Sequence, residues 1–550
     1  MKGGGEKMGK QQPSILNEVI GPVMRGPSSS HVAGAARIGQ LIRQALEGQV
    51  EQVTCDFDVN GSLAESHDGQ GTDMGFACGL LALPMTDSRV GNYEELLSEA
   101  GIQVEYRILD FGAEHPNHYR IHGRSGTGRN VEVDAISTGG GMMELIRLDG
   151  FPVSVRGDYF ETCCFVEGEG FEKAALERAL RELLPAFESV SVSGISQESF
   201  ASAFSVEPMA CMDIRTSRAL AAEEEAALKD RWKIRKMYRF SPVLPTRSRA
   251  FCQVPFLSAS ELLAYNKDRG MELWELALEY ESARGTDTGD RIFGRMADLA
   301  QIMKNAVKIG LAGTDYADRI LQAQAKQIEE RNARLFPCEL MNRTIKNITA
   351  LMEAKSAMEV IVAAPTAGSC GCLPGTLLAV QETLGLPEEA VVKGLLAAGL
   401  VGVFFTERAT FAAEVGGCQM ECGAAAGMAA AGAAQMMGAS AEECLDAASM
   451  ALQSLTGLVC DPVANRVEVP CLNKNITAGM SALASATMAM AGFDKVIPLD
   501  ETIDAMHEIG MKLPQELCCS LGGLGKTPSS MEIRRRLEQG ETAFCGSCSC

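Results

Sequence analysis

Hydrophobic and polar positions divide the chain into a mixed first half and a helical second half. Residues 26–48, "GPSSSHVAGAARIGQLIRQALEG", predict a polar loop followed by an amphipathic helix. Residues 52–63, "QVTCDFDVNGSL", predict a strand, and residues 127–150 predict a strand, a glycine turn and then further strand or helix. This order is typical of an α+β domain, which we place at residues 13–155, after a flexible N-terminus over residues 1–12.

The middle of the chain, residues 156–250, predicts a small α/β or linker module. "YFETCCFVEG" (159–168), "EKAALERALRELL" (172–184) and "SVSVSGI" (189–195) predict strand, helix and strand in turn. The charged run at residues 221–239 predicts a solvated helix or a linker. A regulatory or dimerisation role is compatible with this module, but nothing in it indicates a ligand.

From residue 251 to residue 550 the pattern becomes helical. Ser258 and Glu261 stand three apart before an apolar stretch, the spacing of a capping box at a helix start. The apolar run 394–405 is too short to span a bilayer, and residues 422–440 are mostly Ala and Gly, so we interpret both as buried helices. The predicted fold class is multidomain: an N-terminal α+β domain, a small α/β middle segment and a large, mostly α-helical C-terminal domain.

Composition and charge narrow the classes of partner. Apolar residues make up 46% of the 550 residues but aromatic residues only 5%, which favours closely packed helices over a β-sandwich. A net charge of −21 argues against a nucleic-acid partner. The start of the sequence, "MKGGGEKMGKQQPS", lacks the apolar segment of a signal peptide, so we expect a cytoplasmic protein with no membrane partner. In that reducing compartment, the 19 cysteines are expected to serve packing or metal binding.

Three cysteines in the helical half have unusual settings. Cys418 lies in "EVGGCQMECG", and Cys460 and Cys471 lie in "GLVCDPVANRVEVPCLNKN", which cannot be helical throughout because of its prolines. Loop thiols on glycine and proline backbones suit an iron–sulfur cluster. The alternatives are plain core cysteines, which the wide spacing alone favours, and a zinc site, for which matching CxxC pairs are missing.

The separated motifs together resemble one known family, the bacterial iron–sulfur L-serine dehydratases (L-serine ammonia-lyases). "GPSSSH" (26–31), "GSL…GTD" (61–73), "HPN" (115–117) and "STGGG" (137–141) resemble the β-type domain of that family. "APTAGSCGCLPG" (364–375), "EVGGCQ", "LVCDPV" and "VEVPC" resemble its α-type domain. Their order is that of a single-chain form in which the two domains are fused.

The resemblance implies a cofactor and its ligands. It implies a [4Fe–4S] cluster held by Cys418, Cys460 and Cys471, with one iron left open as a Lewis acid. In some members of the family the C-terminal cysteine occupies that iron, which here assigns the role to Cys550. Cys545 and Cys548 are competitors for this role, and the alternative is a frayed tail with redox-sensitive thiols.

The activity implied by the resemblance is the elimination of water from L-serine, which yields pyruvate and ammonia in amino-acid degradation and gluconeogenesis. This elimination needs an electrophile for the β-hydroxyl and a base for the Cα proton. No motif demands a lysine Schiff base, so we expect no pyridoxal phosphate. The expected partner is a small-molecule amino-acid substrate, and the oligomeric state is open, with a homodimer as one option.

Two loops predict substrate-binding groups because they combine small residues, hydroxyls and free backbone amides, which suit a carboxylate. The residues are Ser28, Ser29 and Ser30 in the first loop, and Thr366, Ala367 and Gly368 in the second. The alternatives are ordinary N-capping by serine in the first loop and an ordinary turn in the second. Three serines exceed what one cap needs, so we favour binding.

Histidines supply the candidate catalytic groups. His31, His115 and Asn117 match active-site motifs of the family, whereas we interpret His122 as structural. The family commonly has "GHGTD" or "GHHTD", but this chain has "SHDGQGTD", with Gln70 in place of the histidine that is the candidate base for the Cα proton. Glutamine cannot take up a proton at neutral pH, so we assign His67 as the substitute base.

This departure leaves other functions open. One is a lyase of the same superfamily that acts on another β-substituted substrate, as an L-cysteine desulfidase or an L-threonine deaminase does. A different class is a non-enzymatic iron–sulfur redox sensor that uses its tail thiols. A redox sensor would not need the serine-rich loop at residues 28–30 or the candidate catalytic His and Asn residues, so we favour an enzyme.

Overall fold

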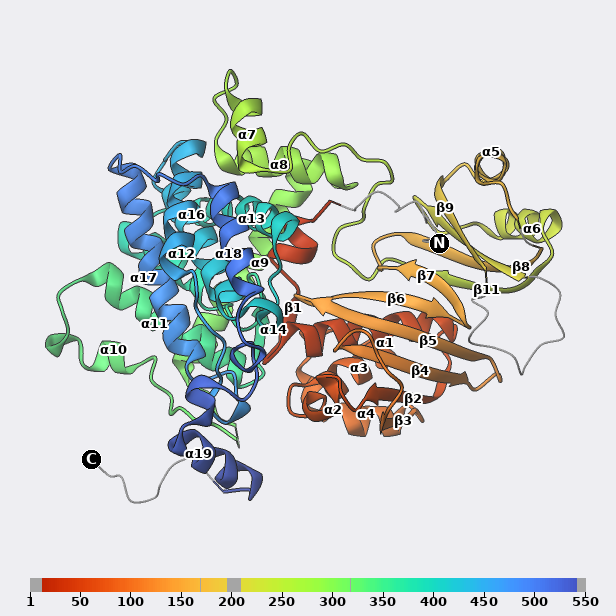
Figure 1. Ribbon diagram of the computed structural model, residues 1–550, viewed down its shortest axis with the longest axis horizontal. Coiled ribbons are helices and arrows are strands. Elements are labelled where there is room, and N and C mark those ends of the chain that lie inside the picture. The colour runs from red at the N-terminus through yellow and green to blue at the C-terminus, as the bar shows by residue number, and fades with distance from the viewer. Residues whose placement is uncertain (1–11, 169, 195–208, 317, 542–550) are drawn as a thin grey trace. The chain divides into compact units, whose positions relative to one another are not determined.

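A computed structural model describes residues 12–168, 170–194, 209–316 and 318–541, and it separates into two compact units. One unit is Pro22–Phe251, and the other joins the described residues before Pro22 to those from Cys252 onward. The first unit is α+β and the second is mostly helical, so the predicted multidomain class is confirmed (Figure 1). The predicted flexible segment 1–12 lies, except for residue 12, outside the described residues.

The α+β unit contains two sheets and the helices that cover them. Its strands are β1 (Val23–Arg25), β2 (Val50–Asp58), β3 (Gln103–Leu109), β4 (His118–Ser125), β5 (Asn130–Gly139), β6 (Met142–Leu148), β7 (Phe151–Val155), β8 (Phe160–Glu167), β9 (Phe187–Gly194), β10 (Met209–Thr216) and β11 (Ile234–Phe240). Its helices are α1 (Ser29–Ala45), α2 (Leu63–Ser66), α3 (Thr72–Leu81), α4 (Tyr93–Glu99), α5 (Lys173–Leu183) and α6 (Ala222–Arg231). The elements predicted at 26–48, 52–63 and 127–150 are all present.

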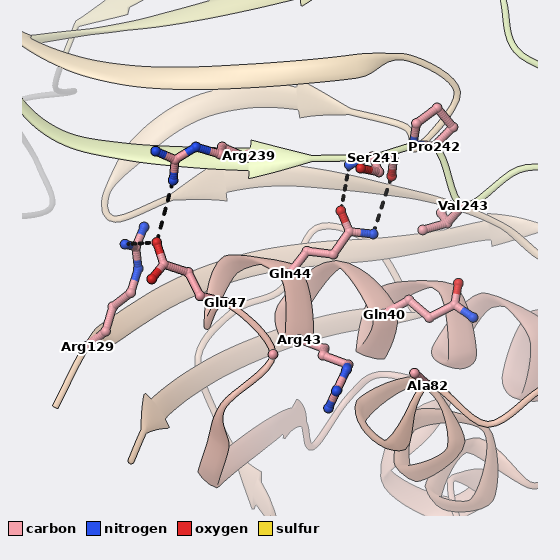
Figure 2. Close-up of a pocket in the computed structure, with 11 residues that line it drawn as sticks. Gln40, Arg43, Gln44, Glu47, Ala82, Arg129, Arg239, Ser241, Pro242 and Val243 are labelled. Atoms are coloured by element: carbon pink, nitrogen blue, oxygen red, sulfur yellow. Dashed lines mark hydrogen bonds and ion pairs between the residues drawn. The ribbon is translucent and has the colours of Figure 1, made fainter. Parts of the chain in front are cut away.

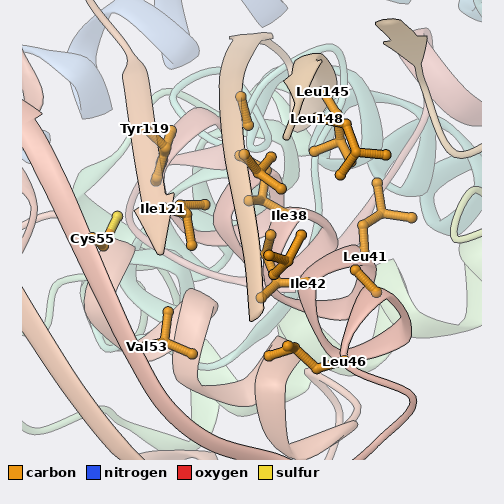
Figure 3. Packing of buried hydrophobic residues seen from close by; sticks show 14 of the residues in the cluster. Ile38, Leu41, Ile42, Leu46, Val53, Cys55, Tyr119, Ile121, Leu145 and Leu148 are labelled. Carbon is orange, nitrogen blue, oxygen red and sulfur yellow. The ribbon is translucent and has the colours of Figure 1, made fainter. Parts of the chain in front are cut away.

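The first sheet has the strand order β3-β2-β4-β5-β6-β7, with a parallel pair only between β2 and β3. Helix α1 packs on β5 and β6, and α3 packs on α1. The two helices cross closely, because a Cβ on Gly79 would lie 2.2 Å from the carbonyl oxygen of Ala36. Apolar side chains of α1, such as Ile38, Leu41 and Ile42, meet those of β2, β4 and β6 in the core (Figure 3).

The second sheet has the strand order β11-β8-β10-β9 and is antiparallel, in a strand–helix–strand–strand–helix–strand sequence. Along β8, Cys163 and Phe165 enter the core shared with the first sheet, whereas Cys164 and Val166 pack toward α5 and α6. Because successive side chains of a strand face opposite sides, this sheet is buried on both faces. The residues on either side of the predicted boundary at 155 therefore share one core.

The charged run 221–239 is only in part what its composition predicts. Helix α6 (Ala222–Arg231) is mostly exposed, as expected. The end of the run is strand β11, in which Tyr238 and Phe240 are buried, so the prediction of a solvated helix or linker is wrong there. Arg239 lies exposed between these two buried residues, and such a strand is stabilised by tertiary packing.

The helical unit has one short strand, β12 (Val360–Val362), among its described residues. Its helices are α7 (Ala259–Asn266), α8 (Leu273–Arg284), α9 (Gly289–Ala312), α10 (Gln327–Glu330), α11 (Glu339–Ser356), α12 (Cys372–Leu384), α13 (Glu388–Arg408), α14 (Ala413–Gly416), α15 (Ala424–Met436), α16 (Ala441–Leu455), α17 (Cys471–Met490), α18 (Leu499–Gly510) and α19 (Pro528–Glu538). Helix α7 begins with the predicted cap, since the Ser258 hydroxyl accepts from the Glu261 N–H at 3.2 Å.

Helix α15 is the centre of the helical unit. All of its residues are buried, and it packs against α12, α13, α16 and α17. Gly394 of α13 and Gly432 of α15 permit a close crossing, since a Cβ on Gly432 would lie 2.7 Å from the Gly394 carbonyl oxygen. The prediction that Ala and Gly pack helices closely is therefore confirmed.

Helix α13 contains the apolar run 394–405. Within the described residues it is the single helix long and apolar enough to cross a membrane, and 78% of its most apolar window is buried inside the protein. Burial of that extent is expected of a core helix, in agreement with the interpretation of the run as a buried helix.

The segment before the α+β unit belongs to the helical unit. The Ser14 hydroxyl donates to the buried Glu281 carboxylate at 2.5 Å, and the Ile15 N–H donates to the same carboxylate at 2.8 Å. The sequence predicts residues 13–21 as part of the α+β domain. These contacts explain why they belong to the helical unit instead.

Candidate functional site

A connected set of hydrogen bonds surrounds His31 in the first turn of α1. The Ser28 Oγ lies 2.9 Å from His31 Nδ1, and the Ser66 Oγ lies 2.8 Å from His31 Nε2. Ser66 donates its own proton to the Ser62 carbonyl oxygen at 2.6 Å, so it accepts from His31. The imidazole therefore carries its proton on Nε2, and Nδ1 accepts from the Ser28 hydroxyl.

His31 is a neutral group at physiological pH. Its side chain is buried, and burial together with the nearby His67 lowers its pKa to about 4. Ser28 stands at the N-cap position of α1, but its side chain makes no capping hydrogen bond. The hydroxyl is used by the histidine instead, which sets this position apart from ordinary N-capping by serine.

His67 forms a dyad with Asp73. Its Nδ1 lies 2.8 Å and 3.0 Å from the two Asp73 carboxylate oxygens, and this hydrogen bond raises the pKa of His67. The ring packs beside Phe57 and Tyr106, at centroid distances of 5.2 Å and 5.5 Å. Because Nδ1 is held by the carboxylate, Nε2 of the neutral ring is the nitrogen left to take up a proton.

His115 and Asn117 lie on the approach to β4. The Asn117 N–H donates to His115 Nδ1 at 3.1 Å, and burial lowers the pKa of His115. The Ser62 hydroxyl donates to Oδ1 of the buried Asn117. Since the Ser62 carbonyl oxygen accepts from Ser66, His31 and Asn117 belong to one chain of contacts. We call the set Ser28, His31, Ser62, Ser66, His67, Asp73 and Asn117 the imidazole network.

The remaining residues predicted for this unit lie close to α1. Ser29 and Ser30 form its first residues, Ser29 is buried, and the Ser30 carbonyl oxygen accepts from the Ser137 hydroxyl at 2.8 Å. The glycines after Ser137 form the tight turn between β5 and β6, with φ between +60° and +105°. Gln70 lies in the loop before α3, and its N–H donates to the Ser66 carbonyl oxygen at 2.9 Å.

The second predicted substrate loop precedes α12 in the helical unit. Thr366 and Ala367 are buried, and the Thr366 hydroxyl donates to the Glu421 carboxylate at 2.7 Å. A Cβ on Gly368 would lie 2.9 Å from the same carboxylate, so a side chain at this position would displace the Glu421 carboxylate. Burial, and then the charge of Cys418, raises the pKa of Glu421 to about 8.

Buried thiols gather next to this loop. Cys418 and Cys460 belong to one apolar cluster with Ala413, and Cys519 packs against it. Hydrogen bonds from Cys422 and Cys460 lower the pKa of Cys418 well below the usual thiol value. The bond to Cys418, followed by one to Cys519, raises the pKa of Cys460. Two of the three predicted ligands are thus in direct contact.

The third predicted ligand, Cys471, is the first residue of α17, and burial followed by the charge of Cys418 raises its pKa. Asn475, one turn later, links it to the other groups. Its amide lies 2.9 Å from the Cys471 carbonyl oxygen, 3.6 Å from the Cys422 sulfur and 2.9 Å from the Gly368 carbonyl oxygen. We call Cys418, Cys422, Cys460, Cys471 and Cys519 the thiol region.

The thiol region fits an iron–sulfur cluster by the chemistry of its donors. Its thiols are buried or nearly so, and the described cysteines are all free. Across the described ranges, no group of three or more His, Cys, Asp or Glu side chains is arranged to hold a single metal ion. Iron–sulfur clusters are held by cysteine thiolates, and this region supplies several cysteines. The chemistry of these donors therefore fits a cluster.

The predicted ligand Cys550, with Cys545 and Cys548, lies outside the described residues.

Sequence reasoning overlooked several groups. In the imidazole network these are Ser62, Ser66 and Asp73, which lie within the motif "GSL…GTD" but have no individual signal. In the helical unit, Lys355 is fully buried, its ammonium donates to the Val467 carbonyl oxygen, and its charge acts on Cys471 and Glu421. Lysines are rarely fully buried unless they are paired, so Lys355, in the apolar segment before β12, could have been noted on that ground.

Comparisons with known proteins agree with one another. The family model "Serine dehydratase alpha chain" matches residues 268–524. The probable L-serine dehydratase α chain of Bacillus subtilis is 35% identical over 285 residues, which cover 51% of this chain and 95% of that protein. The α chain of the Peptoniphilus asaccharolyticus enzyme is 32% identical, with 50% and 97% covered. L-serine dehydratase 1 of Escherichia coli is 31% identical, with 46% and 58% covered.

Proposed function

The chain belongs to the serine dehydratase α-chain family, and from that premise we propose that it is an L-serine dehydratase, an ammonia-lyase that forms pyruvate and ammonia with the help of a [4Fe–4S] cluster. The observation that carries this proposal is the gathering of buried thiols around Cys418, beside the loop that holds Thr366. A match confined to the second half of a 550-residue chain also fits a fused single-chain enzyme.

The ligands that we propose for the cluster are Cys418, Cys460 and Cys471. When bound, the cluster would supply a Lewis acid for the departing hydroxyl, which is a poor leaving group. The buried ammonium of Lys355 offsets part of the negative charge that deprotonated thiols bring to this part of the protein. Asn475 fixes the backbone of Cys471 relative to Cys422 and Gly368.

Residues of the imidazole network move the proton. We assign His67 as the base that takes the Cα proton on Nε2, with the Asp73 carboxylate stabilising the imidazolium that results. His31 stays neutral and accepts from Ser28, so it is suited to orient a hydroxyl or a substrate group and not to pair as a cation. Gln70 cannot act as the base, but in this proposal it does not need to, because His67, three residues earlier, takes the proton.

Two loops are suited to the substrate carboxylate. Ser29 and Ser30 begin a helix of 17 residues, and the free N–H groups of a helix start attract an anion. In the helical unit, Thr366, Ala367 and Gly368 present a hydroxyl and backbone next to Glu421. A substrate hydroxyl or carboxylate that enters this loop competes for the hydrogen bond that Thr366 donates to Glu421.

The test is anaerobic reconstitution followed by initial-rate measurements on L-serine, L-threonine and L-cysteine. We expect pyruvate from L-serine, with a higher kcat/KM than for the other two substrates, and no requirement for pyridoxal phosphate. A higher kcat/KM for L-threonine or L-cysteine would show that L-serine is not the preferred substrate, but the protein would still be a lyase. A full complement of iron and sulfide without turnover of any of the three would favour a redox sensor.

We also propose that Cys550 shields the cluster from oxygen when no substrate is bound, in a cytoplasmic enzyme. Deletion of Cys550 should leave the iron content unchanged and accelerate bleaching of the cluster in air. Cys548→Ala is the matched control, since it keeps the terminal thiol. Equal bleaching rates for the deletion and the unaltered protein would contradict the assignment.

A further inference from the structure

A crevice of about 600 Å³ opens in the α+β unit, at the C-terminal end of α1 (Figure 2). Its walls come from four segments: the last turns of α1 with the residues after them, the residue after α3, the turn before β5, and the end of β11 with the loop that follows. The lining residues are Gln40, Arg43, Gln44, Glu47, Gly48, Ala82, Arg129, Arg239, Ser241, Pro242 and Val243. The volume lies within the range of small-molecule sites.

Two guanidinium groups in this crevice converge on one carboxylate. Arg129 pairs with Glu47 at 2.8 Å and Arg239 pairs with the same carboxylate at 3.5 Å, as Figure 2 shows. Both arginines are held in place from behind. Arg129 donates to the Met237 carbonyl oxygen at 2.6 Å and lies over the Tyr238 ring, and Arg239 binds Glu225 through two nitrogens at 2.5 Å and 2.6 Å.

The balance of charge in the crevice is positive although the chain is strongly acidic. Arg43 adds a third guanidinium, which donates to the Leu80 carbonyl oxygen at 3.0 Å, and Glu47 is the one carboxylate among the lining residues. The net charge of the whole chain is −21. A local excess of arginine in such a chain concentrates a field that attracts anions. The buried Nε of Arg129 also has no hydrogen-bond partner among the described groups.

The crevice is separate from the imidazole network. Helix α1 has 17 residues, with His31 in its first turn and Arg43 in its last. At 1.5 Å per residue, His31 and Arg43 stand about 18 Å apart along this helix. A ligand in the crevice would therefore be a second ligand of this unit, and its binding does not depend on the proposed elimination.

We propose that the crevice binds a small organic anion through a carboxylate or phosphate group. The anion replaces Glu47 as the partner of Arg129 and Arg239, which are already oriented for a planar or tetrahedral oxyanion. Gln44 is committed to the Ser241 backbone, with its oxygen accepting at 2.6 Å and its nitrogen donating at 3.3 Å, and so it fixes the width of the crevice. Ala82, Pro242 and Val243 offer apolar surface to the body of the ligand.

The test uses isothermal titration of the full-length protein in a phosphate-free buffer, with inorganic phosphate and citrate as probes and glycerol as the neutral control. Saturable binding of at least one anion, weakened by added sodium chloride, is the expected result. Phosphate binding alone would assign a phosphate ligand, and citrate binding alone would assign a carboxylate ligand. Absence of binding for both anions would overturn the proposal.

Two substitutions locate the binding. Glu47→Gln removes the competing carboxylate and should tighten binding about fivefold, whereas Gln40→Glu adds a carboxylate and should weaken binding about tenfold. Gln40→Ala is the matched control and should change the affinity less than twofold. Equal affinity in all three variants, with unchanged circular dichroism, would place the anion elsewhere and contradict the assignment of the crevice.

Discussion

The imidazole network and the thiol region are both polar and largely buried, but they differ in how their polar groups are satisfied. Both ring nitrogens of His31 have hydroxyl partners, and His67 has a carboxylate partner. In the thiol region Cys418 contacts Cys422 and Cys460, and two neighbours of the thiols are the fully buried Lys355 and the half-buried Glu421. Thiols are weak hydrogen-bonding groups, so these contacts stabilise little by themselves.

The imidazole network is a site whose polar groups the protein satisfies by itself, whereas the thiol region is the site that we propose to bind a cluster. The imidazole network is preorganised, because each of its rings has one orientation fixed by neighbours. The thiol region gathers cysteines whose mutual contacts would be replaced by stronger bonds to iron. We therefore expect mutations in the thiol region to lower the cofactor content. Mutations in the imidazole network should slow proton transfer and leave the cofactor content unchanged.

The largest effect is expected from the thiol region. Replacing Cys418, Cys460 or Cys471 by Ala removes one ligand, so iron and sulfide content should fall to background and activity by more than about a thousandfold. Iron and acid-labile sulfide are measured after anaerobic reconstitution. The control is Cys444→Ala, which removes a buried thiol of α16 and should keep its iron. Full iron content in any of the three ligand variants would show that its cysteine is misassigned.

The next effect separates proton transfer from cofactor content. His67→Ala should lower kcat by about a hundredfold to ten-thousandfold, the usual contribution of a general base, with the iron content unchanged. Rates and iron are measured on the same preparation. A fall in iron that parallels the fall in rate would mean that His67 supports the fold and does not act as the base.

The pH dependence of the Asp73→Asn variant tests whether His67 is the catalytic base. The Asp73 hydrogen bond raises the pKa of His67, so its loss should lower that pKa. A base must be deprotonated to act, and the acidic limb of the kcat/KM profile should therefore move to lower pH in the variant. An unchanged limb would assign the titration to another group.

A smaller effect concerns the stability of the α+β unit. The pKa of His31 is about 4 in the folded protein and about 6.5 when the chain is unfolded, so the unfolded chain binds more protons between these values. Stability is therefore lost as the pH falls from about 6.5 to 4, by about 3 kcal/mol in total. Hydrogen exchange of the α1 amides measures this, with His31→Gln as the comparison. A difference between the two proteins that does not vary with pH would refute the burial argument.

The smallest effect tests a single hydrogen bond of the imidazole network. Ser28→Ala leaves His31 Nδ1 without its donor and should destabilise α1 by about 1 kcal/mol. Ser30→Ala is the matched control in the same turn. Because Ser28 makes no capping bond, equal destabilisation by both variants would indicate that general helix-start effects dominate.

Much of the fold could be predicted from periodicity and composition. The elements at 26–48, 127–150 and 159–195 follow from local patterns, and the Ala-rich helix α15 follows from small residues that permit close crossing. The second sheet was only partly predicted because β11 contains Arg235, Lys236 and Arg239 and follows a charged helix, so its sequence resembles an exposed segment. Burial of its other face depends on a core shared with the first sheet, which no local pattern encodes.

As with the fold, one part of the candidate site could be predicted from the sequence and another part could not. Histidines and loop cysteines are rare enough to be noticed in a sequence, and family motifs locate Thr366 and Gly368. The partners that set their chemistry are common residues: Ser66 fixes the tautomer of His31, and Asp73 raises the pKa of His67. Their roles depend on contacts made in the folded unit, so the sequence alone does not distinguish them from surface serines and aspartates.

The most direct test of the thiol region is a Mössbauer spectrum of the chain reconstituted anaerobically with ⁵⁷Fe, recorded before and after addition of L-serine. We expect a cluster signal in which a minority of the iron changes its parameters when the substrate is added, because L-serine would replace Cys550 at the one iron that Cys418, Cys460 and Cys471 do not bind. A signal from isolated iron ions, or a cluster signal that L-serine leaves unchanged, would contradict the account.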